Sequence, residues 1–366
     1  MLLIDAHEDL AYNMLRFGRD YTRAAAETRR LESGGDAPAH NGDTLLGWPD
    51  YQRGQTAVVF GTLFAAPRRR HEESEFPHSY ADIPQARRLY SAQLDAYHRL
   101  ADQHPDQFCL IENKKALREV LSKWNAFQAS LNPAALPPPP VGIVVLMEGA
   151  EAVDDPGELE EWWQRGVRWI GPAWAGTRFC GGTREPGPLT SAGFALLEGM
   201  ASFGFGLDLS HMDSKAALQA LDSYPGVIIA SHANVDALLK GIDTNRHLPD
   251  VVIHKLIERD GVIGVIPYNN FLRPGWKRGD SRHLVSLQHL VAHIDAICQM
   301  AGSARHVGIG SDFDGGFGVQ CAPLEIDTIA DLQKLVPLLA EKGYTETDIA
   351  AILGGNWQTK LNQVLR

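Results

Sequence analysis

Short apolar runs recur along the chain, and each is bounded by glycine, proline or polar residues. Continuous runs of this kind, rich in β-branched residues, are typical of parallel strands that are buried on both faces. Eight runs are predicted as strands, at residues 2–4, 57–60, 143–146, 167–170, 205–209, 227–230, 262–266 and 307–310. Segments with the spaced apolar residues of helices lie between most of them, at 84–103, 113–128, 191–203, 214–221, 249–259, 284–301 and 329–342.

This alternation of strands and helices predicts a parallel sheet, and eight strands favour a closed (β/α)8 TIM barrel that occupies residues 1–366 as a single domain. An open, doubly wound sheet is the alternative, but no G-x-G-x-x-G turn follows the first strand. A polar segment at 14–56, rich in Arg, Gly and Asp, is expected as an insertion after the first strand. Two C-terminal helices within 345–366 are expected to close the fold.

Composition narrows the function classes. A hydrophobic fraction of 44% with 22% charged residues is ordinary for a globular protein, and the net charge of -11 argues against nucleic acid or anionic membranes as partners. We find no signal peptide pattern at the start and no uncharged apolar run of about 20 residues, so no membrane span is expected. The four cysteines form no C-x-x-C pair and suit free thiols in a reducing compartment. We therefore expect a cytoplasmic protein.

Polar residues with metal-binding chemistry follow five of the predicted strands, at the ends where a barrel carries its active site. His7 and Asp9 are two apart in an extended segment, so they face the same side. Glu148 directly follows four apolar residues, where a carboxylate is costly unless it is paired or ligated. Two histidines also take the same place in successive βα units. The full set is His7, Asp9, Glu148, His211, His232 and Asp312.

Each of these residues alone has a plainer explanation. His-x-Asp pairs occur by chance, a carboxylate after a strand can be a solvated loop residue, and a single histidine is more often structural. Together they fit a hard or borderline cation site with mixed ligands. A pair of such ions polarises a carbonyl and holds a hydroxide at neutral pH. A neighbouring carboxylate then takes the proton of the nucleophile and passes it to the leaving amine.

The order and spacing of these residues resemble the membrane dipeptidase (renal dipeptidase) family of the amidohydrolase superfamily, over nearly the whole chain. The motifs are His7-x-Asp9, Glu148-Gly149, Asp208-Leu209-Ser210-His211, Ser231-His232, Tyr268-Asn269-Asn270, Gly310-Ser311-Asp312-Phe313-Asp314-Gly315 and Gly354-Gly355-Asn356. The resemblance implies a metallodipeptidase that hydrolyses the peptide bond of dipeptides with a metal-bridged hydroxide. It implies two divalent ions, zinc in the family, although the same ligands would suit Mn²⁺ or Co²⁺.

The resemblance also implies roles for the residues. Glu148 would bridge the two ions, and Asp312 would be the general base and then the general acid. The first ion would take His7, Asp9 and Glu148, with Asp312 close by, and the second would take Glu148, His211 and His232. Independently of the resemblance, Asp314 follows the last strand too far along to be a first choice as ligand and is expected to orient the loop.

Three more positions concern the substrate. Arg246 matches the family's arginine for the terminal carboxylate, and a guanidinium forks well onto that group, although an exposed loop charge is the alternative. Tyr268 is a weaker candidate for a substrate contact and could simply pack. Trp174 stands where the family carries a histidine that steadies the tetrahedral intermediate. Indole donates a hydrogen bond but takes up no proton, so the substrate-facing chemistry is expected to differ while the metal site is intact.

Three functions remain open from the sequence. The first is a dipeptidase, and the second is an amidohydrolase that acts on another carboxylate-bearing amide, such as an N-acyl amino acid, with Trp174 used in recognition. The third is a metal-binding barrel without turnover, which the complete ligand set disfavours. The expected partner is a small-molecule dipeptide or related amide, and the chain is a candidate homodimer.

Overall fold

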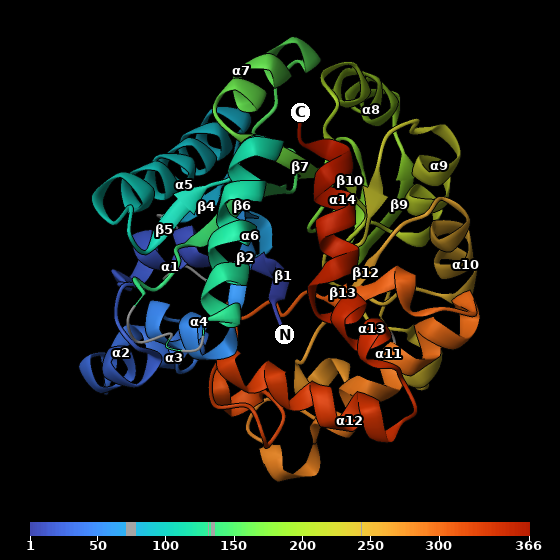
Figure 1. Ribbon diagram of the computed structural model, residues 1–366. Coiled ribbons are helices and arrows are strands. Elements are labelled where there is room, and N and C mark those ends of the chain that lie inside the picture. The colour runs from blue at the N-terminus through green and yellow to red at the C-terminus, as the bar shows by residue number, and fades with distance from the viewer. Residues whose placement is uncertain (71–77, 131, 133–135, 243) are drawn as a thin grey trace.

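Eight parallel strands form a barrel and follow one another around it in chain order (Figure 1). The computed structural model describes residues 1–70, 78–130, 132, 136–242 and 244–366. The strands are β1 (Leu3–Glu8), β2 (Thr56–Phe64), β6 (Val141–Glu148), β7 (Val167–Gly171), β10 (Gly206–Asp208), β11 (Ile228–Ile229), β12 (Ile263–Val265) and β13 (Val307–Ile309). Asp5 on β1 pairs with Ile309 on β13, and a bridge between Ala230 and Ile263 joins β11 to β12. The predicted barrel is confirmed.

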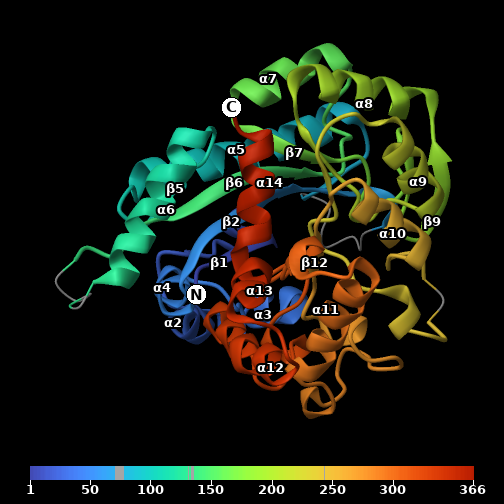
Figure 2. The ribbon, with the colours of Figure 1, turned by 45° about the vertical axis from the view of Figure 1, so that its right-hand side comes forward.

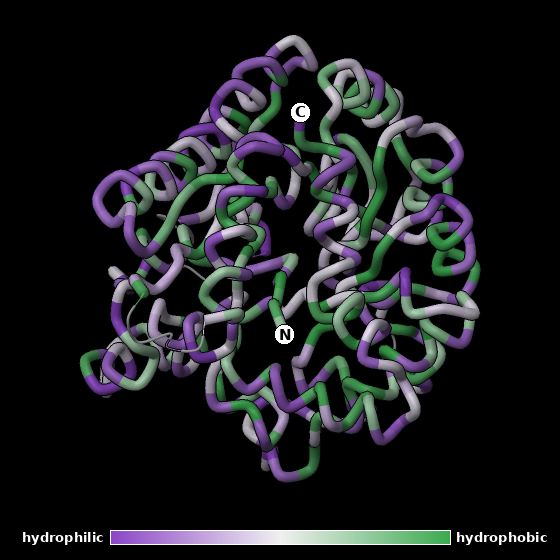
Figure 3. Tube along the Cα trace, in the orientation of Figure 1, coloured by the Kyte–Doolittle hydropathy of each residue, from purple (hydrophilic) through white to green (hydrophobic). Residues whose placement is uncertain are grey.

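Apart from Phe64 at the end of β2, the residues of the barrel strands are buried, as their apolar runs predict. Figure 3 shows the hydropathy of these segments along the chain. At the amino-terminal end of the barrel, the Phe60 ring packs between Trp169 and Trp357, with centroids 5.9 and 5.8 Å away. Gly308 lies under this cluster, and a Cβ there would lie 2.3 Å from Trp357 Nε1. The indole ring therefore requires glycine at this position of β13.

Helices surround the barrel in the places that the sequence predicts (Figure 2). The predicted helices correspond to α5 (Ile83–Gln103), α6 (Lys114–Ala129), α8 (Ser191–Phe203), α9 (Ser214–Ser223), α10 (Asp250–Glu258) and α11 (Leu287–Ala301). The segment at 329–342 differs, because it begins as a 3₁₀-helix over Ile329–Lys334 and becomes α12 only at Leu335–Glu341. No helix in the described part of the chain is long and apolar enough to cross a membrane.

Several short elements have no counterpart among the predictions. They are α7 (Leu159–Gln164), β5 (Phe108–Leu110), which pairs with β6, and the two small sheets β3 (Ala66–Pro67) with β4 (Ser79–Tyr80) and β8 (Cys180–Gly182) with β9 (Glu185–Leu189). The β8–β9 hairpin follows β7 and extends over the carboxyl ends of the barrel strands, where it contributes to the site described below.

The segment between β1 and β2 is the predicted insertion, and it folds into short helices. These are α1 (Leu10–Phe17), α2 (Ala25–Glu32), α3 (Asp36–Asn41) and α4 (Trp48–Gly54). Its chain is tied to the loop after β13, because the hydroxyls of Tyr21 and Thr44 and the backbone N–H of Leu45 all donate to the Asp314 carboxylate. Arg19 adds an ion pair to the same carboxylate at 3.0 Å. The insertion thus supports the carboxyl ends of the barrel.

The C-terminal segment lies across the opposite, amino-terminal end of the barrel, with α14 in red over the strands in Figure 1. It comprises α13 (Glu346–Ala350), a π-helical turn over Ala351–Gly355 and α14 (Asn356–Val364). Trp357 Nε1 donates to the Ile309 carbonyl at 2.9 Å, and Asn356 Nδ2 donates to the carbonyls of Ala304 and Val307, both at 2.7 Å. These bonds attach the last helix to β13 and to the turn before it.

Candidate active site

The structure brings all six predicted ligands together at the carboxyl ends of the strands. Their donor atoms form three overlapping trios, each with its atoms within 4.8 Å of one another: His7, Asp9 and Glu148; Glu148, His211 and His232; and His7, His232 and Asp312. Glu148 Oε1 lies 3.0 Å from Nε2 of His211 and 3.3 Å from Nε2 of His232. It also lies 3.7 Å from Nε2 of His7. Glu148, His7 and His232 each belong to two trios, and Glu148 is the carboxylate that the trio of His7 and Asp9 shares with the trio of His211 and His232.

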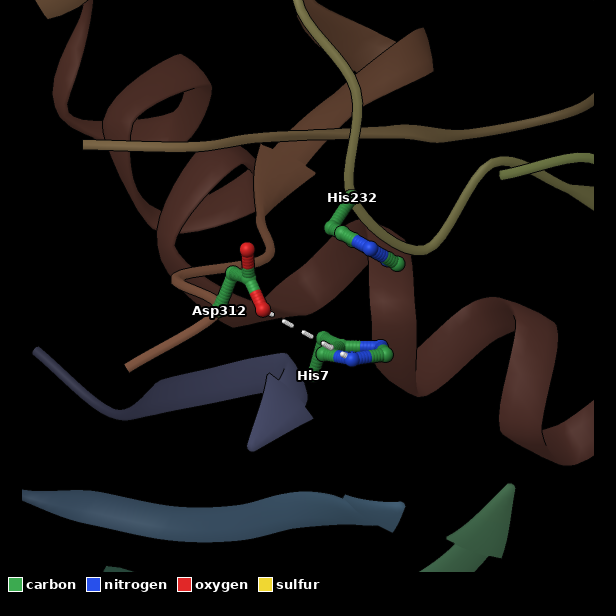
Figure 4. Close-up of side chains that lie close together, drawn as sticks. All are labelled: His7, His232 and Asp312. Atoms are coloured by element: carbon green, nitrogen blue, oxygen red, sulfur yellow. Dashed lines mark ion pairs between the residues drawn. The ribbon is translucent and has the colours of Figure 1, made fainter. Parts of the chain in front are cut away.

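Figure 4 shows one face of this cluster, where His7 and His232 lie ring against ring and the Asp312 carboxylate points at His7. The two ring centroids are 3.7 Å apart, and Asp312 Oδ1 lies 3.8 Å from His7 Nε2. The distance of 3.8 Å between Asp312 Oδ1 and His7 Nε2 is too long for a hydrogen bond. It leaves room for an ion that the same atoms would coordinate.

Unpartnered buried atoms show that the cluster suits cations. Both ring nitrogens of His7, Oδ1 of Asp9 and Oε1 of Glu148 are buried and have no hydrogen-bond partner among the described residues. Buried polar atoms are normally hydrogen-bonded or bound to a metal, because leaving them unpaired is costly. Imidazole nitrogens with carboxylate oxygens are a donor set for zinc and related divalent ions. The residues present therefore fit the metal ions that the sequence predicts.

The pKa values of the cluster residues also indicate that this site suits cations. Burial raises the pKa of Glu148 well above its usual value, and the neighbouring Asp9 and Asp312 add to the rise against the opposing charge of His7. Burial likewise raises the pKa of Asp312, to about 7, although His7 opposes it. Burial lowers the pKa of His7, but Glu148, Asp9 and Asp312 outweigh it and raise that pKa to about 10. Crowded carboxyl groups of this kind attract positive charge.

Hydrogen bonds behind the histidines fix which ring nitrogen faces the cluster. The Ser231 hydroxyl donates to the Asp208 carboxylate and lies 2.9 Å from Nδ1 of His232, so Nδ1–H must donate to it and Nε2 keeps its lone pair. Asp208 also accepts from the backbone N–H of Ser231 at 2.7 Å. Thr183 Oγ1 lies 2.9 Å from Nδ1 of His211, on the corresponding side of that ring. Such contacts orient ligands and tune their affinity.

The loops that carry the cluster adopt an uncommon backbone conformation. His211, Asp312 and Asp314 all have positive φ, at 67°, 57° and 61°. Non-glycine residues in this region cost about 1–3 kcal/mol each and gather at functional sites. Gly315 cannot be replaced, because a Cβ there would lie 2.0 Å from Asp312 Oδ1 and 2.8 Å from Asp9 Oδ2. The Asp314 contacts described above hold this loop, which agrees with its predicted orienting role.

A pocket of about 540 Å³ opens onto the cluster, and Arg246, Trp174 and Tyr268 all line it. Arg246 is 5% exposed, and its Nη2 donates to the His232 carbonyl at 3.0 Å. Its Nη1 is buried and has no hydrogen-bond partner among the described residues. Arg246 is therefore a buried guanidinium in the pocket and not an exposed loop charge.

The two aromatic candidates lie on different walls of the pocket. The Trp174 ring lies 6.1 Å from His211 and 5.2 Å from Phe64, measured between centroids. Tyr268 stacks on Phe317, with centroids 4.5 Å apart, and meets the edge of Phe271 at 4.8 Å. Tyr268 thus packs as well as lining the pocket. A second aromatic wall of Tyr12, Phe17 and Phe64, and the Thr183 contact, were not predicted. Phe64 ends β2, which extends four residues beyond the predicted strand at 57–60, and the other residues lie in segments without a strand signal.

A barrel with such a cluster at the carboxyl ends of its strands defines the class as a metal-dependent hydrolase of the amidohydrolase fold. The family model described as membrane dipeptidase, peptidase family M19, matches residues 1–365. The chain belongs to that family, which binds divalent metal ions and acts on dipeptides.

The chain is also similar to individual proteins and to solved structures. An uncharacterized protein of the pqqA 5' region of Klebsiella pneumoniae is 32% identical over 61% of this chain and 82% of its own length. The dipeptidase ataJ of Aspergillus terreus is 26% identical over 99% of this chain and 84% of its own length. The fold resembles that of a Rhodobacter sphaeroides metallopeptidase solved with a phosphinate mimic of the dipeptide L-Ala-D-Ala, with a TM-score of 0.78 at 23% identity over 100% and 99% of the two chains.

Proposed function

We propose that this protein is a two-metal dipeptidase that holds zinc or a similar divalent ion at each side of Glu148. The observation that carries the proposal is the meeting of three ligand trios beside a buried arginine with an unpartnered Nη1, all in one pocket. His7 and Asp9 would hold one ion, His211 and His232 would hold the other, and Glu148 would serve both.

The ions, when bound, would polarise the carbonyl of the scissile bond and lower the pKa of the attacking water. Asp312 lies at the edge of the cluster and lines the pocket, so its carboxylate is placed to take a proton from the nucleophile. The same carboxyl group would then donate that proton to the departing amine. For this transfer, Asp312 must lie within hydrogen-bond distance of both the nucleophile and the leaving amine. Its position between the cluster and the pocket would allow this.

Arg246 would hold the C-terminal carboxylate of the substrate. A guanidinium group binds a carboxylate with two parallel hydrogen bonds, and the buried Nη1 of Arg246 supplies a donor for it. The aromatic ring of Phe271, 5.6 Å from the guanidinium carbon, supports the group from the side. Binding the free carboxylate would restrict the substrates to short peptides that end beside the metals.

The test is the release of amino acids from a panel of dipeptides that includes L- and D-alanine at the C-terminal position. The D-residue is included because the Rhodobacter sphaeroides relative was solved with a mimic of L-Ala-D-Ala. We expect hydrolysis of free dipeptides, and losses of about 10²-fold or more in kcat/KM for the C-terminal amides and for the Arg246→Met variant. Metal-loaded protein that cleaves none of the panel would refute the proposal.

A second candidate is an amidohydrolase for N-acyl amino acids, and one observation favours it. The pocket wall away from Arg246 is aromatic, with the rings of Tyr12 and Phe64 5.6 Å apart and those of Phe64 and Trp174 5.2 Å apart. The acidic residues that line the pocket are the proposed ligands and Asp314, which the insertion already saturates. This wall would therefore suit an apolar acyl group better than a free ammonium group. Faster release of an amino acid from its N-acyl form than from any dipeptide would establish this alternative.

A further inference from the structure

Arg184 occupies the turn of the β8–β9 hairpin and lines the pocket that opens onto the metal cluster. Its φ of 62° is in the left-handed region, which favours glycine at such turns. Its backbone N–H donates to Asn245 Oδ1 at 2.8 Å, and its carbonyl accepts from Arg70 Nη2 at 3.1 Å. The turn is therefore fixed in a strained form with a long cationic side chain at the position where glycine would cost less.

The guanidinium of Arg184 is exposed and makes no hydrogen bond or ion pair with the described residues. Among the described residues, no carboxylate pairs with it. Glu185, which follows it in the chain, is shared by Arg69 at 2.7 Å and Arg70 at 2.9 Å, so these three arginines and one glutamate together carry a net positive charge. The whole chain has a net charge of -11, so a local positive charge at the mouth of the pocket would attract anionic ligands there.

Asn245 connects this turn to the loop that carries Arg246. It accepts from the Arg184 backbone, and its Nδ2 donates to the Gly182 carbonyl at 2.9 Å and to Asp213 at 3.1 Å. Arg184 also acts on Tyr268, whose pKa is raised by burial and lowered to a smaller degree by this guanidinium and that of Arg278. Arg184, Arg246 and Tyr268 all line this pocket, and Asn245 links the backbone of Arg184 to the residue before Arg246.

We propose that Arg184 forms a second anion site at the pocket mouth, which selects substrates with a carboxylate in the side chain of their C-terminal residue. The proposal rests on the proposed function, in which Arg246 holds the α-carboxylate of that same residue. An aspartate or glutamate there would then place its two carboxylates on two arginines whose loops are joined through Asn245. A neutral glutamine or asparagine would lose the charge of the outer contact and leave the inner contact unchanged.

The experiment compares glutamate with glutamine, which have the same shape and differ in charge. Binding of both free amino acids, as L- and D-forms, is measured by calorimetry on the metal-loaded protein, because these are products and need no turnover. Hydrolysis of Ala-Glu and Ala-Gln in both C-terminal configurations is measured alongside. The variants are Arg184→Met, which removes the charge, Arg184→Lys, which keeps it, and Arg118→Met, a matched loss of charge at an exposed position of α6 outside the pocket.

We expect the wild-type protein and Arg118→Met to prefer the glutamate ligand by about tenfold, since a charged hydrogen bond at a partly exposed site is of this size. Arg184→Met should bring the ratio near one, and Arg184→Lys should keep part of the preference. A ratio near one in the wild-type protein, or a ratio that Arg184→Met leaves unchanged, would overturn the proposal. If the protein bound glutamate preferentially but hydrolysed no dipeptide, the second anion site would be supported. Only the proposed dipeptidase function would then be contradicted.

Discussion

The hydroxyl oxygen of Thr183 lies 2.9 Å from Nδ1 of His211, on the side of the ring that faces away from Glu148. The contact comes from the β8–β9 hairpin and engages a ring nitrogen that would not bind metal. It thereby orients the imidazole so that Nε2 is directed at Glu148, at 3.0 Å. An arrangement of this kind tunes a ligand without touching the ion.

Replacing Thr183 with valine should weaken metal binding while leaving the fold intact, because valine keeps the shape and removes the hydroxyl. Loss of such a supporting contact typically lowers metal affinity by about 10–100-fold. Competition with a chromogenic chelator would measure it, with Thr359→Val as the control, since that hydroxyl is exposed on α14 and remote from the pocket. Equal affinities for the two variants would show that Thr183 has no orienting role.

Asp314 should be a principal contributor to stability at the active-site end of the barrel. Its buried carboxylate pairs with Arg19 at 3.0 Å and accepts bonds from Tyr21, Thr44 and Leu45. Removing one partner of a buried ion pair costs about 3–5 kcal/mol, so Asp314→Ala should lower the free energy of unfolding by roughly that amount. Urea denaturation would measure it.

The matched control is Asp36→Ala. Asp36 pairs with Arg16 at 3.7 Å, but its side chain is 74% exposed. Pairs on the surface contribute little, about 0–1 kcal/mol. If Asp36→Ala and Asp314→Ala shifted the unfolding midpoint equally, the account of a tethered loop would be wrong.

His293 should make stability depend on pH. Burial lowers its pKa to about 4 from the usual 6.5, with His289 as a smaller cause, and its Nδ1 accepts the Val235 N–H at 3.1 Å. The unfolded chain binds the proton more readily than the folded protein between these values. The contribution of His293 is therefore complete above about pH 6.5 and is lost as the pH falls toward about 4, by about 1.4 kcal/mol per pH unit at most.

The measurement is the free energy of unfolding of the wild-type protein and of His293→Gln at several pH values between 4 and 7. His247, whose pKa burial lowers to about 3, titrates in an overlapping range, so the difference between the two curves is the quantity of interest. The difference should shrink as the pH falls. Parallel curves would exclude His293 as the source.

Trp174→His should raise dipeptide turnover. Trp174 lines the pocket with its ring 6.1 Å from His211, and the resemblance to the family implies a histidine that contacts the substrate at this position. One oxyanion donor is worth about 10²–10³ in turnover, so even a partly placed imidazole gives a measurable gain. Trp174→Phe, which keeps an aromatic ring and removes the N–H, should give no gain. Unchanged or lower kcat in Trp174→His would mean that this position does not determine the difference from the family.

The barrel, and the meeting of the six candidate ligands at one end of it, could be predicted from the sequence because both depend on local signals. Buried parallel strands are continuous apolar runs, and even β11, which is only Ile228–Ile229, lies within such a run. The ligands directly follow these runs, and a closed barrel brings all its strand ends to one rim. His211 and His232, 21 positions apart in the chain, meet for this reason, with their Nε2 atoms 2.9 Å apart.

The substrate side of the site could not be predicted in the same way. The β8–β9 hairpin carries Thr183 and Arg184, but β9 contains Pro186 and Pro188, and it has neither the alternation of a strand nor the spacing of a helix. Its position depends on Asn245, more than 60 residues away, which binds the turn through its side chain. Contacts of that range leave no periodic pattern in the sequence. Hence Arg246 could be assigned by resemblance, whereas Arg184 required the structure.

The most direct test of the account is a metal titration of activity. Protein stripped of metal with a chelator receives increasing equivalents of Zn²⁺, and the release of alanine from Ala-Ala, with L- and D-residues at the C-terminus, is followed at each step. We predict no hydrolysis in the stripped protein and a recovery that saturates at two equivalents. Hydrolysis by the stripped protein, saturation at one equivalent, or no hydrolysis in fully loaded protein would contradict a two-metal dipeptidase centred on Glu148.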